Sequence, residues 1–175
     1  MIDSLGIIGT GHLSAFVCEG LRASGWTHEL LVSPYNQEKA EAFCQRFDAR
    51  TADSNQDIID RTKAVLIAVR PAQMKQALSG LIWPKNQIVI SAAAGVKISA
   101  LSDIAGRTQI VRVMPISAAA YMASPTTMFP NNPEVSELLS HIGAVIPMAN
   151  EVEFDIATAN AAAYVDILIY RHPAS

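Results

Sequence analysis

The chain has 175 residues, of which 50% are hydrophobic and only 17% are charged, and its formal net charge is −3 at pH 7. This length suits one well-cored domain and is too short for two full-sized ones. A negative chain without a basic cluster argues against a nucleic-acid partner, because neutralising phosphates requires a face rich in Lys and Arg. No apolar run approaches membrane-spanning length and no signal-type segment opens the chain, so we expect a cytoplasmic protein without a membrane partner.

The first predicted strand leads directly into a glycine-rich turn at residues 6–14, which reads Gly-Ile-Ile-Gly-Thr-Gly-His-Leu-Ser. In a strand-turn-helix unit of this kind, Gly9 permits the tight bend and Gly11 lets a pyrophosphate approach the backbone. The helix that opens near His12 directs N–H groups and its positive dipole end at such phosphates. Ser14 replaces the third glycine of the usual fingerprint, a mild departure because serine is small. The turn predicts a dinucleotide site.

Strands and helices alternate along the rest of the chain. Buried or alternating apolar runs predict strands over residues 29–33, 49–51, 64–69, 87–91, 109–114, 126–129 and 144–147. Helices are expected over residues 36–47, after a cap at Asp53 or Ser54, from Pro71 to near Gly80, and over 98–104 and 133–141. This alternation predicts an α/β fold, a doubly wound and mostly parallel Rossmann-type sheet with helices on both faces.

The end of the second predicted strand bears on the choice of dinucleotide. NAD-specific domains usually place Asp or Glu there to hold the ribose 2′-hydroxyl. Here no acid lies between Glu29 and Glu38, and Ser33, Asn36 and Lys39 offer hydrogen bonds or charge to a 2′-phosphate. The sequence therefore favours NADP, although the same stretch is also typical of ordinary turn chemistry.

Several later motifs, in the same order and spacing, resemble the landmarks of pyrroline-5-carboxylate reductases. Besides the glycine turn they are Val69-Arg70-Pro71, the segments 90–96 and 111–115, Phe154-Asp155 and Ala163-Tyr164-Val165. The resemblance implies an NADPH-binding domain at residues 1–150 and, at 151–175, a linker helix that starts a truncated helical dimerisation domain. In that family a cyclic imine carboxylate is reduced to proline by hydride transfer.

The resemblance also implies which residues bind the cofactor. The pyrophosphate would be held by Gly9, Gly11, His12 and Leu13, and the adenosine ribose phosphate by Ser33 and Asn36. The nicotinamide ribose and ring would be bordered by Val69, Arg70, Pro71, Ala93, Ala94 and Gly95. No catalytic residue is assigned, and no metal is expected because His28, His141 and His172 have no ligand partners at suitable spacing.

Three departures from the family pattern bear on the substrate. Where the family reads Met-Pro-Asn-Thr-Pro, this chain has Ile116 in place of the polar residue after Met114-Pro115. The segment 158–164 is shorter than its family counterpart and lacks the glycine and proline found there. The family also continues into a helical domain beyond the point where this sequence stops, which indicates a fragment, a truncated product or a relative that kept only cofactor binding.

Three functions remain open on the sequence. The first is an NADPH-dependent oxidoreductase acting on a small cyclic imine carboxylate or a related small molecule. The second is a non-catalytic or partial NADP-binding module. The third is a deazaflavin (F420)-dependent NADP oxidoreductase-like domain, since related domains serve such enzymes.

Two further expectations concern packing. The segment 153–170 reads as a helix that is apolar around most of its circumference, so it must be covered. The cover could be a further helical domain, the same helix of a second chain or the core of this domain, and we expect a homodimer. Arg112, inside a strand pattern, is interpreted as an exposed strand end. Cys18 and Cys44 match no metal spacing and are expected to be buried or half-buried thiols.

Overall fold

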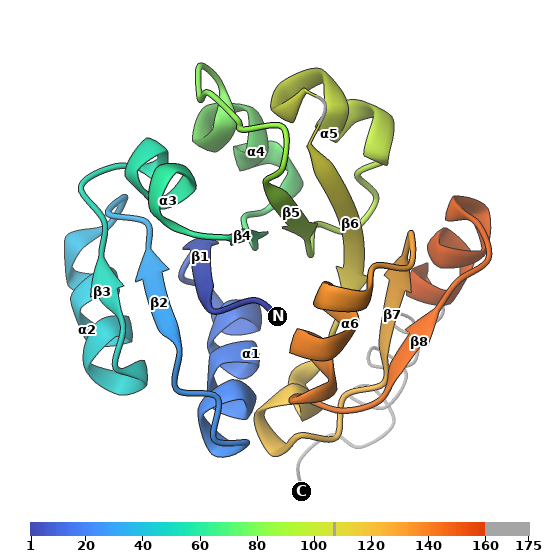
Figure 1. Ribbon diagram of the computed structural model, residues 1–175, viewed down its shortest axis with the longest axis horizontal. Coiled ribbons are helices and arrows are strands. Elements are labelled where there is room, and N and C mark those ends of the chain that lie inside the picture. Colours follow the sequence, from blue (N-terminus) through green and yellow to red (C-terminus); the bar gives the residue numbers. More distant parts are fainter. Residues whose placement is uncertain (107, 160–175) are drawn as a thin grey trace, which may run out of the picture.

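The structure is a computed structural model that describes residues 1–106 and 108–159. Within these ranges one sheet of eight strands has the order β3-β2-β1-β4-β5-β6-β7-β8 (Figure 1). All neighbouring strands are parallel except β6 and β7. The strands are β1 (Ser4–Ile8), β2 (Glu29–Val32), β3 (Arg50–Thr51), β4 (Ala64–Ile67), β5 (Ile88–Ser91), β6 (Gln109–Met114), β7 (Thr126–Phe129) and β8 (Val145–Pro147). The predicted doubly wound, mostly parallel sheet is confirmed.

Helices cover both faces of this sheet. One face carries α1 (His12–Ala23), α2 (Gln37–Phe47), α6 (Pro133–Ser140) and the 3₁₀ helix η1 (Ser117–Tyr121). The other face carries α3 (Asn55–Arg61), α4 (Pro71–Leu78) and α5 (Ile98–Ala105). Residues 151–159 are helical as well. No helix in the described ranges is both long enough and apolar enough to cross a membrane.

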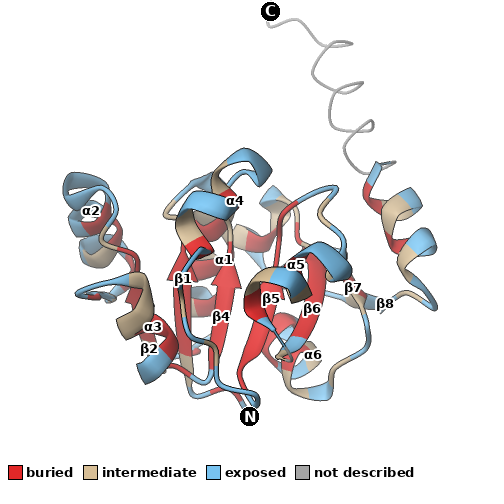
Figure 2. Cartoon of the chain, turned by 90° about the horizontal axis from the view of Figure 1, so that it is seen from above, coloured by how far each residue is buried: buried red, intermediate tan, exposed pale blue. Residues whose placement is uncertain are grey.

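Two hydrophobic cores result, one on each side of the strands. Successive side chains of a strand point to opposite faces, so Leu5 and Ile7 pack under α1 while Ile8 packs under α3 and α4. Figure 2 shows the buried strands between helices whose outer surfaces are exposed. Strands buried on both faces explain why a chain with so little charge reads as a series of apolar runs.

Local sequence signals set most of the element boundaries. The side chain of Asn36 caps α2 by accepting a hydrogen bond from the backbone N–H of Lys39, and Ser54, not Asp53, caps α3 in the same way. Strand β4 ends at Ile67, two residues earlier than predicted, because the chain turns there toward α4. The 3₁₀ helix η1 was not predicted. Both cysteines are free thiols, and burial raises the pKa of Cys18 to about 12.

The interpretation of Arg112 as an exposed strand end is wrong. Its side chain is only 1% exposed, and its guanidinium contacts the carboxylates of Glu151 and Asp155 and lies over the ring of Phe154. A charge on a central strand is retained because three partners from one later segment pair with it.

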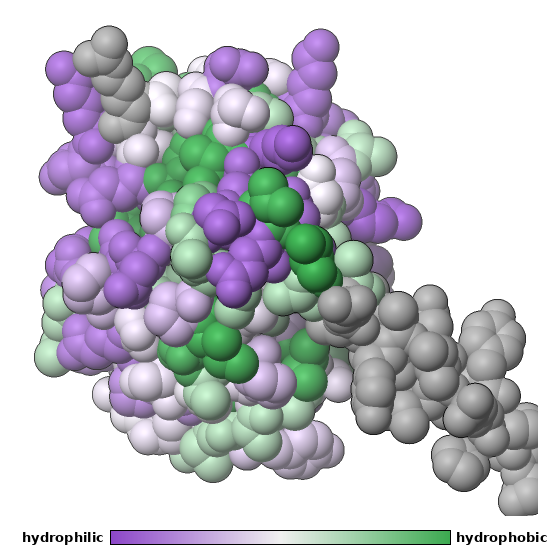
Figure 3. Space-filling model, turned by 90° about the vertical axis from the view of Figure 1, so that its right-hand side faces the viewer, coloured by the Kyte–Doolittle hydropathy of each residue, from purple (hydrophilic) through white to green (hydrophobic). Residues whose placement is uncertain are grey.

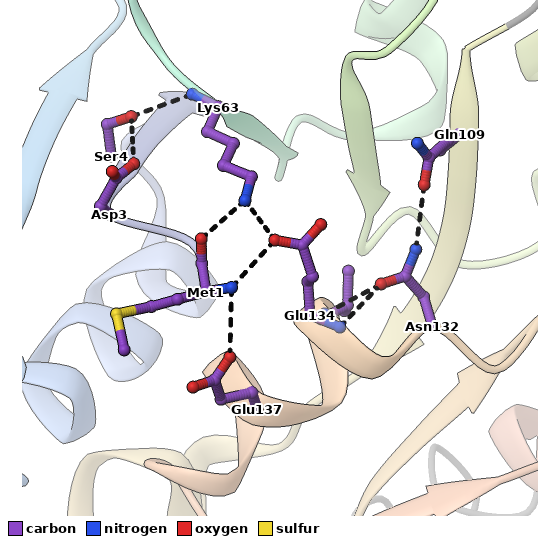
Figure 4. Close-up of polar contacts among 9 residues, drawn as sticks. Met1, Asp3, Ser4, Lys63, Gln109, Asn132, Glu134 and Glu137 are labelled. Carbon is purple, nitrogen blue, oxygen red and sulfur yellow. Dashed lines mark hydrogen bonds and ion pairs between the residues drawn. The ribbon is translucent and has the colours of Figure 1, made fainter.

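A polar cluster ties α6 to the amino-terminal ends of β1 and β4 (Figure 4). The Nζ of Lys63 donates to the carbonyl of Met1 at 2.7 Å and to the carboxylate of Glu134. The amino group of Met1 donates to the same carboxylate at 3.0 Å and lies 3.5 Å from Glu137. Hydrogen bonds from Lys63 and from this amino group lower the pKa of Glu134. The cluster lies at the end of the sheet opposite the carboxyl ends of the parallel strands.

Most of the apolar helix predicted over residues 153–170 lies outside the described residues. The same holds for most of the altered segment 158–164, and the domain division at residue 150 stays a prediction.

Candidate functional site

A cavity of about 830 Å³ opens at the carboxyl ends of β1, β2, β4 and β5. Strands β1 and β4 are neighbours in the sheet, yet the chain leaves β1 toward β2 and returns later to form β4. Open α/β sheets bind their ligands at such a switch point, because the loops on either side diverge and leave a crevice.

Two glycines shape the turn between β1 and α1 for different reasons. Gly9 has φ +111°, and a Cβ added there would lie 2.8 Å from the carbonyl carbon and oxygen of Ala68. Gly11 has an ordinary extended backbone with φ −92°, and a Cβ added there would meet no atom within 4 Å. The fold therefore requires Gly9, whereas at Gly11 the missing side chain leaves space at the cavity wall.

Ser14 does more than replace a glycine with a small residue. Its side chain is fully buried, and its hydroxyl donates to the carbonyl of Gly9 at 2.7 Å and to that of Gly11 at 2.9 Å. A glycine could not make these bonds. The hydroxyl of Ser14 thus stabilises the tight turn of the fingerprint motif.

The amino terminus of α1 faces the cavity without a side-chain cap. Its N-cap residue is Gly11, its first turn contains no acid, and both His12 and Leu13 line the cavity. The first N–H groups of a helix have no partner within the helix and carry its positive dipole end. This arrangement suits a phosphate or another anion.

The charges around the cavity have one sign. Lys39 and Arg70 line it, and none of the described residues that line it is Asp or Glu. The Nε of Arg70 donates to Gln73 at 3.4 Å, so its guanidinium lies along the first turn of α4. Two cations without an opposing carboxylate favour an anionic ligand.

At the β2 end of the cavity, polar side chains are organised by bonds among themselves. The buried hydroxyl of Ser33 donates to Asn55 at 2.7 Å, and the side-chain nitrogen of Asn55 donates to the carbonyl of Ala77 at 3.0 Å. The side-chain oxygen of Asn36 accepts from the N–H of Lys39 at 2.9 Å. The side chain of Asn36 therefore caps α2, which is ordinary turn chemistry. The cap uses the side-chain oxygen, so the amide nitrogen of Asn36 is the atom that can donate to a ligand.

At the β4 and β5 end the cavity wall is mostly apolar, formed by Val69, Pro71 and residues 92–94 together with the charged Arg70. All of the predicted cofactor-binding residues line the cavity except Gly95, which forms a turn with φ +72° just beyond it. Their roles in binding stay predictions. Ile116 does not line the cavity.

Several lining residues were not predicted as site residues. They are Ile8, Thr10, Tyr35, Asn55, Ala68, Gln73, Gln76, Ala77 and Ala92. The spacing of Gln73 and Gln76 on one side of a helix was a usable signal. Asn55 gave none, because its place depends on a contact with Ser33.

Comparisons with known proteins agree with this geometry. A family model described as NADP oxidoreductase, coenzyme F420-dependent, matches residues 4–95, which is more than half of the chain. The chain belongs to this family. Membership in a family of NADP oxidoreductases confirms the predicted cofactor class, NADP.

Individual relatives confirm the resemblance to pyrroline-5-carboxylate reductases. The Escherichia coli K12 enzyme of that name is 30% identical over 136 residues, which cover 75% of this chain and 51% of that enzyme. The structure of 1-pyrroline-5-carboxylate reductase from Streptococcus pyogenes is 27% identical with a TM-score of 0.81, over 95% of this chain and 66% of that one. The Plasmodium falciparum pyrroline carboxylate reductase with NADP bound, 19% identical over 96% and 66% of the two chains with a TM-score of 0.73, shows the same fold.

The chain spans about half the length of the curated relatives it matches. The match to the family model ends at Gly95, within the loop that follows β5. The glycine turn, the switch point and the apolar end of the cavity therefore all fall within the matched region.

Proposed function

We propose that the chain is the NADP-binding part of an NADPH-dependent reductase that transfers hydride to a small cyclic imine carboxylate or a related compound. One observation carries the proposal. A cavity that no described Asp or Glu lines lies at the switch point of the sheet, bounded by Gly11 and the uncapped amino terminus of α1. The fit is good for a dinucleotide, whose two phosphates need N–H donors and whose ring needs an apolar wall.

The residues would divide the binding task along the cavity. Backbone N–H groups at Gly11, His12 and Leu13 would bind the pyrophosphate, while Lys39 and the amide nitrogen of Asn36 would bind a 2′-phosphate. At the far end Val69 and residues 92–94 would exclude water and fix the plane of the ring. When bound, NADPH supplies the hydride.

The wall at the β5 end favours the second candidate, a module that binds NADP without catalysing a reaction itself. In the part of the chain that the structure describes, no Asp, Glu, His, Lys, Cys or Tyr lines that end of the cavity. A proton donor for a reduced imine is therefore not among these residues. A deazaflavin as the hydride partner is the third candidate, and the family description names coenzyme F420.

An NADPH oxidation assay with pyrroline-5-carboxylate separates these candidates. We expect turnover above the rate without substrate but on the order of 100-fold below that of the Escherichia coli relative, because the residues described here position only the cofactor. The same assay with an oxidised deazaflavin is the second arm. NADPH oxidation with the deazaflavin but not with pyrroline-5-carboxylate would contradict the proposed imine substrate. NADPH binding without turnover in either arm would contradict the proposed reductase activity and support the non-catalytic binding module.

We also propose that the protein acts on a small molecule as a homodimer. Strand β8 is an edge of the sheet, and Ile146, Val152 and Ile156 on and beyond it expose apolar side chains. Figure 3 shows apolar surface on this side of the molecule. The apolar sequence from residue 160 onward lies outside the described residues.

Light scattering tests the dimer. We expect a dimer mass for the chain, and a shift toward monomer for Val165→Glu combined with Leu168→Lys, with NADPH affinity unchanged. The reason is that two charges on an apolar contact must be desolvated when the copies associate. A monodisperse monomer of the unmutated chain at high concentration would contradict the proposal. The cytoplasmic location stays a prediction.

A further inference from the structure

One buried cation anchors the segment that follows β8. Arg112 lies on β6 and is 1% exposed, and its Nη1 donates to Glu151 at 2.9 Å while its Nη2 lies 2.7 Å from Asp155. The ring of Phe154 lies 4.5 Å from the guanidinium carbon. All three partners belong to the start of the helix at residues 151–159, so the guanidinium fixes that helix on the sheet.

Glu151 has a second contact, on the helix next to it. The oxygen that accepts from Arg112 also accepts from the backbone N–H of Ile98 at 2.8 Å. Ile98 is the first residue of α5, whose N-cap residue Lys97 makes no side-chain cap and whose first turn contains no acid. The carboxylate that caps α5 is therefore supplied from 53 residues further along the chain.

The contact fixes one end of the loop that forms the apolar wall of the cavity. The loop leaves β5 at Ser91, contributes residues 92–94 to the wall, turns at Gly95 and ends at Ile98. Its first end is held by the sheet, where Ser91 pairs with Arg112. Its second end is held by the hydrogen bond from Ile98 to Glu151. One end of the loop thus pairs with the strand that carries Arg112, and the other end bonds to Glu151, which is the partner of the Arg112 guanidinium.

We propose that Glu151, held in place by Arg112, is a positioning residue for the loop at residues 92–97, and so sets the affinity for the nicotinamide half of the cofactor without touching it. The proposal rests on the proposed function for the identity of the ligand. It predicts a selective effect, because the β2 end of the cavity, where Ser33 and Lys39 lie, has no contact with this pair.

The test compares two ligands on matched variants. NADPH reaches both ends of the cavity, whereas adenosine 2′,5′-bisphosphate has no nicotinamide and reports the β2 end alone. We expect Glu151→Ala to weaken NADPH binding about tenfold, as expected for a lost charge-assisted hydrogen bond, and to leave the affinity for the bisphosphate unchanged. Glu151→Gln keeps an acceptor oxygen for Ile98 and should recover most of the NADPH affinity.

Asp155→Ala is the matched control, because Asp155 contacts the same guanidinium but not α5. It should lower the stability of the fold through the loss of one ion pair with Arg112 while keeping NADPH affinity. The proposal would be overturned if Glu151→Ala weakened the binding of both ligands equally. It would also be overturned if Asp155→Ala weakened NADPH binding as much as Glu151→Ala does.

Hydrogen exchange at the Ile98 amide tests the bond to Glu151 without any ligand. We expect protection in the unmutated chain, in Asp155→Ala and in Glu151→Gln, and fast exchange in Glu151→Ala. The same exchange rate in all four proteins would overturn the positioning role. If the unmutated chain bound neither ligand, the proposed function would be wrong, and the exchange pattern would still decide whether Glu151 orders the loop.

Discussion

Replacement of Gly11 by valine is expected to weaken NADPH binding by at least about 100-fold, roughly 2.7 kcal/mol, in a chain that remains folded. The backbone of Gly11 is in an ordinary extended conformation, and a Cβ added there meets no atom within 4 Å. The branched side chain would instead occupy the space through which a pyrophosphate approaches the first N–H groups of α1. Calorimetry measures the affinity, and thermal unfolding measures the stability.

Ala23→Val serves as the control, because it adds the same branched side chain at an exposed position in the last turn of α1. It should leave NADPH affinity unchanged. The loss of stability in Gly11→Val should stay within about 1 kcal/mol, since only the preference for glycine over valine at an N-cap is lost. Binding of NADPH to Gly11→Val as tight as to the unmutated chain would show that the phosphates do not pass this glycine.

Gly20→Ala is expected to destabilise the fold by about 2–3 kcal/mol, although alanine is the better helix former by about 1 kcal/mol. Gly20 lies inside α1, where η1 packs against it. A Cβ added there would lie 2.0 Å from the carbonyl oxygen of Ala119 and 3.0 Å from the Cγ2 of Ile142. Because the nearest atom belongs to the backbone, η1 must move away from α1 to make room. The midpoint of urea unfolding measures the effect.

The control for this second change is Ala23→Gly on the same helix, at an exposed position. It should reduce stability by no more than about 1 kcal/mol through helix propensity alone. The two substitutions are opposite in chemistry yet should both lower stability. A rise in stability for Gly20→Ala would mean that η1 does not pack closely against α1 in solution.

The features that the sequence predicts well are local ones. The strands are continuous apolar runs, and the cap at Ser54 follows from a side chain that bonds to an N–H group three residues away. The glycine turn is local too, because Gly9 and Gly11 act on backbone within the same loop or the strand beside it. The phosphate end of the cavity could therefore be predicted from a motif and the order of the elements, whereas the residues at its β4 and β5 end were implied by the resemblance to pyrroline-5-carboxylate reductases.

The features that the sequence does not predict depend on contacts between distant segments. Nothing near Arg112 indicates that its partners come from residues 151–155, so its burial could not be foreseen. The 3₁₀ helix η1 has no periodic sequence pattern. Its position depends on Gly20 of α1, where the absence of a side chain lets the carbonyl of Ala119 approach closely. Asn55 is held at the cavity by its bonds to Ser33 and to the carbonyl of Ala77. In each case tertiary packing, and not local propensity, decides the structure.

Titration calorimetry of the unmutated chain with NADPH and with NADH tests most directly whether this cavity binds NADP through contacts to its 2′-phosphate. The β2 end of the cavity has Lys39 and Asn36 as cation and donor, and no carboxylate lines the cavity among the described residues. We expect NADPH to bind about tenfold more tightly than NADH, as one phosphate-lysine contact would give. Equal affinities for the two cofactors would contradict the predicted preference for NADP, and the absence of binding by either would contradict the assignment of the cavity.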